Sequence, residues 1–211
     1  MTKLDKIDNI YFKREDQNIT GSAKDRVIPK IVDYIAKNNF KEAVISSTGN
    51  AGISAQYFCD QKNIKLTVFV SPKIDKNKLS LIKNPIVSDK AISDAFKYAK
   101  KNNAYLIRIS TDKHALEYQE IGKELLKQIP NVTDIFIACG SGATALNIKK
   151  VLPSQIKLFI VQPASYCPLS SLYDPDFNTE NYTDLFCSGG MNISNAFHTA
   201  NCLLEGDITK S

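Results

Sequence analysis

Short apolar runs alternate with longer stretches of helical periodicity along this chain. Residues Ile135–Ala138 form a run without a polar position, a pattern typical of a strand buried on both faces of a parallel sheet. Residues 27–35 instead place Val and Ile side chains along one helical stripe. An alternation of this kind predicts an α/β architecture in which helical crossovers join mostly parallel strands.

The same pattern predicts the individual elements. The expected strands are Ile10–Lys13, Ala43–Ser47, Leu66–Val70, Ile86–Ser88, Tyr105–Ile109, Asp134–Cys139 and Leu158–Gln162. The expected helices are Ser22–Asn38, Ala51–Gln61, Ile74–Ile82, Lys90–Asn102, His114–Gln128 and Ala143–Val151. Periodicity fades from Pro163 to Ser211, where turn-forming residues accumulate and one helix is expected near Ile193–Leu204.

Composition indicates a globular protein rather than a nucleic-acid or membrane protein. The 211 residues are 43% hydrophobic, enough for a sizeable core, and the net charge of +5 is mild. Two basic clusters, Lys73–Lys83 and Lys97–Lys101, lack interleaved stacking aromatics, so we interpret them as solvated surface. No apolar run approaches the roughly 20 residues that span a membrane, and the first residues do not resemble an export signal.

The cysteines also bear on the cellular compartment. There are five, an odd number, and they form no CxxC pair. This spacing disfavours a disulfide framework or a zinc site and fits a reducing compartment. We therefore predict a cytoplasmic protein that binds no metal, membrane or nucleic acid.

The first loop of chemical interest runs from Asn18 to Arg26 and leads from a strand into a helix. Thr20 or Ser22 is suited to cap that helix, which places Lys24 in its first turn. The positive end of the helix dipole and partial burial both lower the pKa of an amine, and a neutral amine is the form that attacks an aldehyde. Taken alone, the loop fits an ordinary surface lysine at a helix start better than a reactive one.

Two further strand-to-helix loops have the composition of ligand-binding turns. Residues Ser46–Gly52 combine small residues with Thr48 and Asn50, although an ordinary turn has the same composition. Residues Gly140–Thr144 place glycines and hydroxyls before a helix, as phosphate-binding loops do, but lack the Walker A ending and the full GxGxxG pattern. All three loops follow strands, and ligands of open α/β sheets bind at the carboxyl ends of strands.

Together these segments resemble fold-type II pyridoxal-phosphate-dependent enzymes. Phe12–Arg26 is similar to the family's K-x-E-x-x-N-P-T-G-S-F-K-D-R segment, and Ser46–Gly52 to its S-S-T-G-N-T/A segment. Gly140–Ala143 resembles the glycine-rich phosphate loop, Ala115–Leu125 the helix that precedes it, and Ile160–Pro163 the V-E-P that follows. The resemblance covers about residues 10 to 165, with Ala23 and Ile19 departing from the usual aromatic residue and proline.

The resemblance implies a role for each loop residue. Lys24 is expected to hold pyridoxal 5'-phosphate as a Schiff base and to move protons, and Asn50 to hydrogen-bond the phenolic oxygen. The residues expected to bind the substrate carboxylate are Ser47, Thr48 and Gly49. Those expected to bind the cofactor phosphate are Gly140, Ser141, Gly142, Ala143 and Thr144. The family's pyridine-nitrogen partner is a Ser or Thr, for which Ser194, Thr199 and Thr209 are available.

The resemblance also implies a fold and an activity. We expect two small three-layer α/β units like those of the tryptophan synthase β subunit: residues 1–106, and a shortened C-terminal unit of residues 107–211. The expected activity is that of an amino-acid lyase or transferase like threonine synthase, acting on a small-molecule amino acid. The protein is expected to form a homodimer. Two alternatives remain: cysteine synthase-like β-replacement, and a cofactor-binding relative without turnover.

Overall fold

The computed structural model describes residues 1–47, 49–74, 76–140 and 142–162. The chain divides into two compact units, residues 1–114 and 115–211, which are described separately below. The division follows His114, whereas the sequence indicated one near Leu106. The helix expected near Ile193–Leu204 and the candidates Ser194, Thr199 and Thr209 lie outside the described residues.

The first unit begins with a hairpin and a bent helical segment. Its elements are β1 (Leu4–Ile7), β2 (Ile10–Lys13), the 3-10 turns η1 (Glu15–Gln17) and η2 (Ala23–Arg26), and the helix α1 (Ile28–Lys37). Strands β1 and β2 pair antiparallel. The sequence did not reveal β1 because it is only partly buried and has no apolar periodicity.

A break in the backbone divides the helix expected over Ser22–Asn38 into η2 and α1. Pro29 lies in the first turn of α1, where its missing N–H costs no hydrogen bond, and a continuous helix would place it in an interior turn. The stripe predicted from the sequence is confirmed, because Ile28, Ile31, Val32 and Ile35 are all buried.

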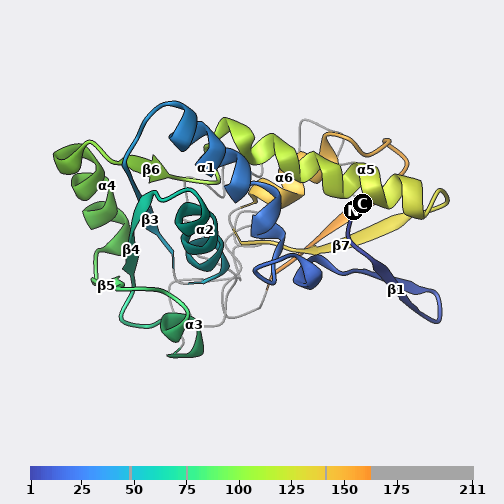
Figure 1. Ribbon diagram of the computed structural model, residues 1–211. Helices are drawn as coiled ribbons and strands as arrows, with labels where there is room; N and C mark the ends of the chain where they lie inside the picture. Colours follow the sequence, from blue (N-terminus) through green and yellow to red (C-terminus); the bar gives the residue numbers. More distant parts are fainter. Residues whose placement is uncertain (48, 75, 141, 163–211) are drawn as a thin grey trace, which may run out of the picture. The chain divides into compact units, whose positions relative to one another are not determined.

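A parallel four-stranded sheet forms the centre of this unit. In chain order its strands and helices are β3 (Glu42–Ser46), α2 (Asn50–Gln61), β4 (Lys65–Val70), α3 (Lys76–Ser80), β5 (Ile86–Val87), α4 (Ala91–Asn102) and β6 (Tyr105–Ile107). The strand order is β5-β4-β3-β6 and every neighbouring pair is parallel. The carboxyl ends of β3 and β4 therefore lie at the same edge, where the Ser47–Asn50 loop begins (Figure 1).

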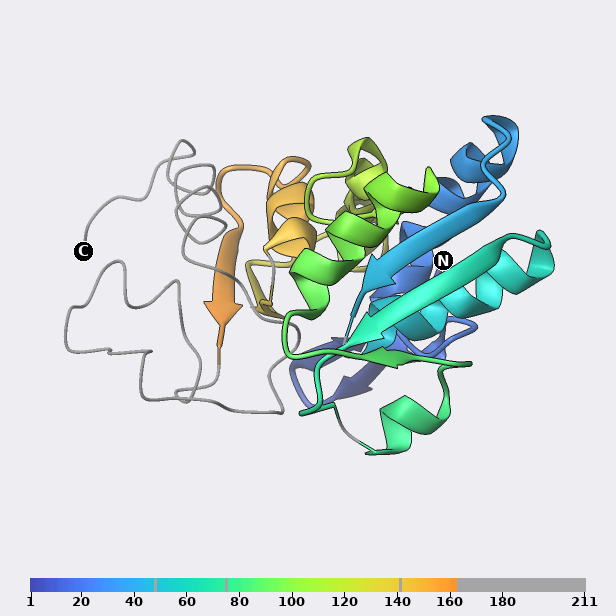
Figure 2. The same cartoon turned by 90° about the vertical axis from the view of Figure 1, so that its left-hand side faces the viewer.

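Helices cover both faces of this sheet. Val44 and Phe69 pack against Ala95 and Ala99 of α4, whose small side chains allow close approach to the sheet. Val68, which points to the opposite face, lies against Gly52 of α2. Figure 2 shows α2 and α4 on opposite sides of the strands, the three-layer arrangement expected from the sequence.

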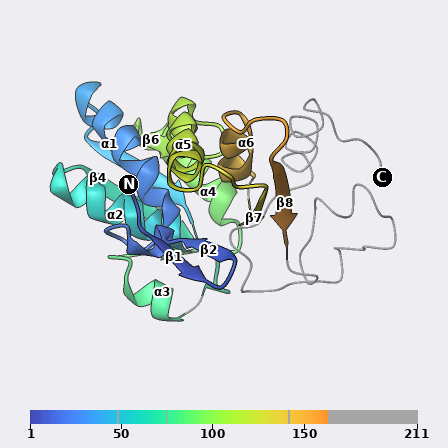
Figure 3. The ribbon, with the colours of Figure 1, turned by 90° about the vertical axis from the view of Figure 1, so that its right-hand side faces the viewer.

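The second unit contains the 3-10 segment η3 (Lys113–Tyr118), which crosses the division, and then α5 (Gln119–Gln128), β7 (Asp134–Ala138), α6 (Ala143–Lys149) and β8 (Lys157–Val161). Strands β7 and β8 are parallel (Figure 3). Their inner face packs Ile137, Leu158 and Ile160 around Cys139 and Ala145. The predicted mostly parallel α/β fold is thus confirmed. Among the described helices, none has both the length and the apolar character required to cross a bilayer.

Candidate functional site

Lys24 lies in a short helical turn whose start is fixed by a serine. Ser22 is buried, has extended backbone angles, and accepts a hydrogen bond from the backbone N–H of Lys24 at 3.3 Å. The Lys24 side chain is half-buried. The structure therefore presents this lysine in the first turn of η2, as the sequence predicted.

Asp25 ties the Lys24 turn to helix α2. Its carboxylate accepts hydrogen bonds from the backbone N–H of Thr20 at 2.6 Å and from the hydroxyl of the same residue. It also accepts one from Ser54, a fully buried residue of α2, at 2.6 Å. Because α2 begins with Asn50, the residue next to Lys24 is hydrogen-bonded to the helix that carries the second predicted cofactor residue.

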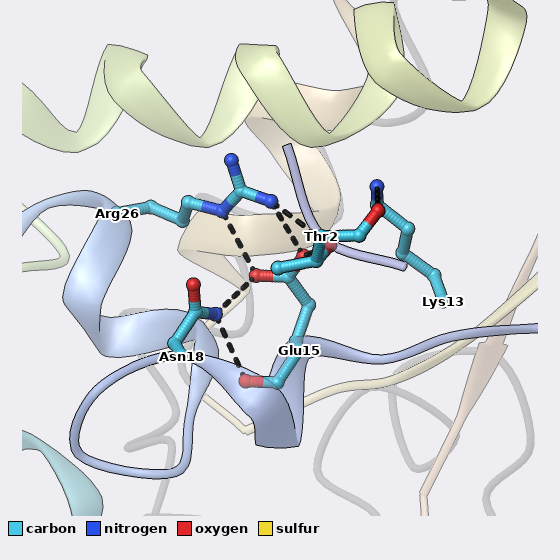
Figure 4. A network of polar contacts seen from close by, with 5 residues as sticks. All are labelled: Thr2, Lys13, Glu15, Asn18 and Arg26. Atoms are coloured by element: carbon cyan, nitrogen blue, oxygen red, sulfur yellow. Dashed lines mark hydrogen bonds and ion pairs between the residues drawn. The ribbon is translucent and has the colours of Figure 1, made fainter. Parts of the chain in front are cut away.

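Arg26 holds the other side of the same turn (Figure 4). Its guanidinium donates to both carboxylate oxygens of Glu15, at 3.0 Å and 2.8 Å. Thr2 and Asn18 donate to the same carboxylate at 2.6 Å and 2.8 Å. The side chains of Arg26 and Glu15 are only 13% and 17% exposed. Four donor contacts to one half-buried carboxylate connect the N-terminal segment, η1 and η2.

The electrostatic consequence is a lowered pKa for Glu15. Burial by itself raises the pKa of this carboxyl, but the hydrogen bonds from Arg26, Thr2 and Asn18, together with the charge of Arg26, outweigh it. Glu15 is therefore ionised at neutral pH, and the Arg26 charge beside Lys24 remains paired.

The loop between β3 and α2 is folded around the Ser47 hydroxyl. This oxygen accepts hydrogen bonds from the backbone N–H groups of Gly49 at 3.3 Å and of Gly52 at 3.0 Å, and it donates to the carbonyl of Gly49 at 3.3 Å. Asn50 follows as the first residue of α2, and its side chain is exposed at the carboxyl edge of the sheet. Thr48 lies outside the described residues.

The third loop lies in the second unit, between β7 and α6. Gly142 adopts the left-handed conformation, with φ of +82°, which disfavours any residue with a Cβ atom. The first hydrogen bond inside α6 runs from the N–H of Leu146 to the carbonyl of Gly142, so the N–H groups of Ala143 and Thr144 have no acceptor within the helix. Ser141 lies outside the described residues.

The structure thus divides the predicted site residues between the units. Lys24, Ser47, Gly49 and Asn50 belong to the first unit, and Gly140, Gly142, Ala143 and Thr144 to the second. Within the first unit, the Asp25–Ser54 hydrogen bond links the lysine turn to the Asn50 helix. Sequence reasoning missed Ser54, because a serine in a helix interior carries no local signal of a partner 29 positions away.

These donor sets fit a phosphorylated aldehyde. Backbone N–H groups of a glycine-containing turn and the Thr144 hydroxyl are suited to phosphate oxygens. A half-buried lysine and an exposed amide are suited to the aldehyde and to a ring oxygen. Each donor set is therefore chemically suited to the part of pyridoxal 5'-phosphate that the sequence assigned to its own loop.

Comparison with solved structures places the fold. A hydrogen sulfide-producing enzyme from Fusobacterium nucleatum is 27% identical, with a TM-score of 0.73, over 91% of this chain and 71% of that one. A pyridoxal 5'-phosphate-dependent aspartate racemase is 21% identical, with a TM-score of 0.74, over 92% of this chain and 64% of the racemase. Diaminopropionate ammonia lyase from Escherichia coli is 14% identical, with a TM-score of 0.76, over 94% of this chain and 64% of the lyase.

The chain spans less than two thirds of the length of the racemase and of the ammonia lyase. The similar enzymes also differ in the reactions they are named for, so the comparisons support the cofactor and the fold but no single substrate.

A family model gives the assignment directly. The model described as pyridoxal-phosphate-dependent enzyme matches residues 1–196, which is most of the chain. The three loops that carried the resemblance in the sequence lie within that range. The chain therefore belongs to the pyridoxal-phosphate-dependent enzyme family and has the fold-type II architecture.

Proposed function

We propose that this protein is a pyridoxal-phosphate-dependent amino-acid lyase or transferase like threonine synthase, which carries out elimination and replacement at the β or γ carbon of an activated amino acid. The proposal goes beyond family membership, because it names a reaction and a substrate class. It is supported by the order and spacing of the Lys24, Ser47–Asn50 and Gly140–Thr144 loops.

The observation that carries the proposal is the double attachment of the lysine turn. Asp25 is hydrogen-bonded to Ser54 on one side of Lys24, and Arg26 is paired with Glu15 on the other. A catalytic amine has to be held within a fraction of an ångström of its target, and residues fixed by buried hydrogen bonds provide such positioning. An ordinary surface lysine needs neither attachment.

The chain's residues then take separate roles. The Lys24 amine would bond to the cofactor and afterwards accept and return protons at the substrate carbons. Asn50 would donate its amide hydrogen to the ring oxygen, and the loop residues Ser47, Thr48 and Gly49 would hold the substrate carboxylate. The Gly140–Thr144 turn would hold the phosphate. When bound, the cofactor supplies an electron sink for negative charge at the substrate's α carbon.

One comparison favours a second candidate, cysteine synthase-like β-replacement. The solved structure at 27% identity is named as a hydrogen sulfide-producing enzyme, and sulfide is the co-substrate of the β-replacement that makes cysteine. The two candidates share every residue role above and differ in the length of the substrate's side chain.

Turnover assays separate the candidates. The purified protein with added pyridoxal 5'-phosphate is incubated with O-phosphohomoserine, and separately with O-acetylserine and sulfide, and products are measured. Threonine from the first substrate supports the proposal, and cysteine from the second supports the alternative. Absence of both products, with the cofactor demonstrably bound, would indicate a member of the family that binds the cofactor without turnover.

The cytoplasmic location and the homodimeric state of the protein both stay predictions.

A further inference from the structure

A hollow in the surface of the first unit lies where helices α1 and α4 end and strand β3 begins. Its volume is about 460 Å³, within the range of roughly 300–1,000 Å³ that is typical of small-molecule sites. It is lined by residues 38–42, Asn102 and Asn103. Strand β3 then runs for five residues, which is about 16 Å, to the loop that carries Ser47 and Asn50. The hollow is therefore separate from that loop.

The two helices end in the same way at this hollow. The side-chain amide nitrogen of Asn38 donates to the carbonyl of Tyr34 at 2.8 Å, and that of Asn102 donates to the carbonyl of Tyr98 at 2.9 Å. Each bond holds the amide against the last helical turn, so its Oδ1 atom has a fixed direction and remains an acceptor. Helix carboxyl ends also carry partial negative charge, which favours hydrogen-bond donors such as hydroxyl groups.

The next residue at each helix end has an amide that the fold does not use. Asn39 and Asn103 adopt the left-handed conformation, with φ of +61° and +51°. Both side chains are exposed, and neither forms a hydrogen bond with a residue that the structure describes. Glycine satisfies the backbone of such helix ends with the least strain, so each asparagine adds an amide with one acceptor and two donors.

Glu42 contributes a carboxylate with one occupied and one open oxygen. Its Oε1 atom accepts hydrogen bonds from Thr67 at 2.9 Å and Tyr98 at 2.7 Å and lies 3.0 Å from the Nζ atom of Lys65. The described part of the chain provides no donor to Oε2. Burial by itself raises the pKa of Glu42, but the hydrogen bonds from Tyr98, Lys65 and Thr67 lower it by more. The open oxygen therefore belongs to an ionised carboxylate, which is a strong acceptor for a hydroxyl group.

The surrounding charge and one aromatic ring select the kind of ligand. Lys65 pairs with Glu42, and Lys41 adds a second ammonium to the lining, so the two ammonium groups oppose a cation. An anion would meet the ionised Glu42 oxygen, whereas a neutral ligand avoids both penalties. Phe40, whose ring is held edge-on to Tyr105 with centroids 5.4 Å apart, adds apolar surface for the C–H face of a sugar ring.

We propose that this hollow is a second ligand site of the protein and that it takes a neutral polyhydroxylated molecule, such as a pyranose sugar. Hydroxyl groups of the ligand donate to Glu42 and to the amide oxygens of Asn38 and Asn102, and they accept from the amides of Asn39 and Asn103. The site is independent of the reaction proposed above, because none of its residues belongs to the three loops.

The probe is methyl α-D-glucopyranoside, which has no aldehyde form and so does not react with lysines. It is titrated into the isotope-labelled full chain while the backbone amide resonances of Phe40 and Ala104 are followed by NMR. The test variant is the double substitution Asn39→Gly/Asn103→Gly, and Asn63→Gly is the matched control. Asn63 is also exposed and left-handed, with φ of +54°, but it follows α2 and does not line the hollow. Glycine suits these backbone positions, so both variants should keep the fold.

We expect a saturable shift in wild type with a Kd of about 1–10 mM, as a few hydrogen bonds to a small exposed ligand give. The double variant should bind about tenfold more weakly, because hydrogen bonds are lost, while Asn63→Gly should stay close to wild type. Glu42→Gln keeps the shape of the side chain and should also weaken binding about tenfold, because the ionised acceptor is lost. No saturable shift in wild type, or equal weakening in the double variant and the control, would overturn the inference.

Two further titrations test the charge of the ligand and the place where it binds. Ethylammonium chloride and sodium acetate are each titrated at constant ionic strength, and tighter saturable binding of either ion than of the glucoside contradicts a neutral ligand. The glucoside titration is then repeated with excess pyridoxal 5'-phosphate. Unchanged affinity supports a separate site whether or not the proposed reaction is observed, and displacement of the glucoside by the cofactor contradicts it.

Discussion

Replacing Glu15 with glutamine tests the attachment that holds the Lys24 turn from its Arg26 side. Glutamine keeps the shape of the side chain and removes its charge. The Arg26 guanidinium would then face a neutral amide at 2.8–3.0 Å while only 13% of its side chain is exposed to water. One of the two parallel N–H···O contacts is lost, because an amide offers one oxygen in place of two.

The expected cost follows from the burial and the number of contacts. Removing one partner of a fully buried ion pair costs about 3–5 kcal/mol, and a single hydrogen bond to a charged group contributes about 1.5–3 kcal/mol. Since this pair is mostly but not fully buried, we expect Glu15→Gln to lower the free energy of unfolding by about 2–3 kcal/mol. With an m-value of about 2 kcal/mol per molar urea, the unfolding midpoint falls by about 1 M.

Urea unfolding followed by circular dichroism measures this shift, with Asp16→Asn as control. Asp16 pairs with Arg14 on the exposed surface, so its substitution should leave the midpoint nearly unchanged. The affinity for pyridoxal 5'-phosphate should also fall in Glu15→Gln and not in Asp16→Asn. Equal, small effects of the two substitutions would refute the idea that the Glu15–Arg26 pair positions the lysine turn.

The same pair gives a pH dependence of definite sign. The pKa of Glu15 is lowered in the folded protein, so its contribution is fully present above the ordinary carboxyl value of about 4.3 and is lost as the pH falls through the lowered value. The stability difference between wild type and Glu15→Gln should therefore be constant near neutrality and shrink in this acid range. A difference that grows on acidification would contradict the assignment.

Three further substitutions have outcomes fixed by the local geometry. Ser54→Ala removes a buried hydrogen bond to Asp25 and should cost about 1–3 kcal/mol of stability, measured by urea unfolding, and weaken cofactor binding. Gly142→Ala introduces a Cβ atom at φ of +82° and should lower the free energy of unfolding by about 1–2 kcal/mol. It should also weaken the binding of inorganic phosphate, which is measured by NMR titration. Gly122→Ala would place a Cβ atom 2.6 Å from Val151 Cγ2 and should lower the melting temperature without changing the cofactor affinity of the protein that remains folded.

The architecture was readable from the sequence because its strands are buried and its helices amphipathic. The strand predicted over Leu66–Val70 forms over Lys65–Val70, four of whose residues are buried, and the strand predicted over Asp134–Cys139 ends one residue earlier. The helix predicted over Ile74–Ile82 forms only over Lys76–Ser80, because the segment is polar and only Ile82 is deeply buried there. Partly exposed strand β1 gave no periodic signal at all.

The site was readable only as three separate loops. Motif spacing identified Lys24, Asn50 and the Gly140–Thr144 turn as candidates, but their supporting contacts depend on residues brought together by folding. The Asp25–Ser54 and Arg26–Glu15 contacts join positions 29 and 11 residues apart, and neither spacing follows a helical or strand period.

If Lys24 is the amine that binds the cofactor, borohydride reduction should fix the cofactor to its side chain. Wild-type protein and Lys24→Ala are incubated with pyridoxal 5'-phosphate, reduced with borohydride, digested, and mapped by mass spectrometry. We expect a covalent adduct on the peptide that contains Lys24 in wild type and its loss in the variant. An adduct confined to another lysine, or an equal yield of adduct in Lys24→Ala, would contradict it.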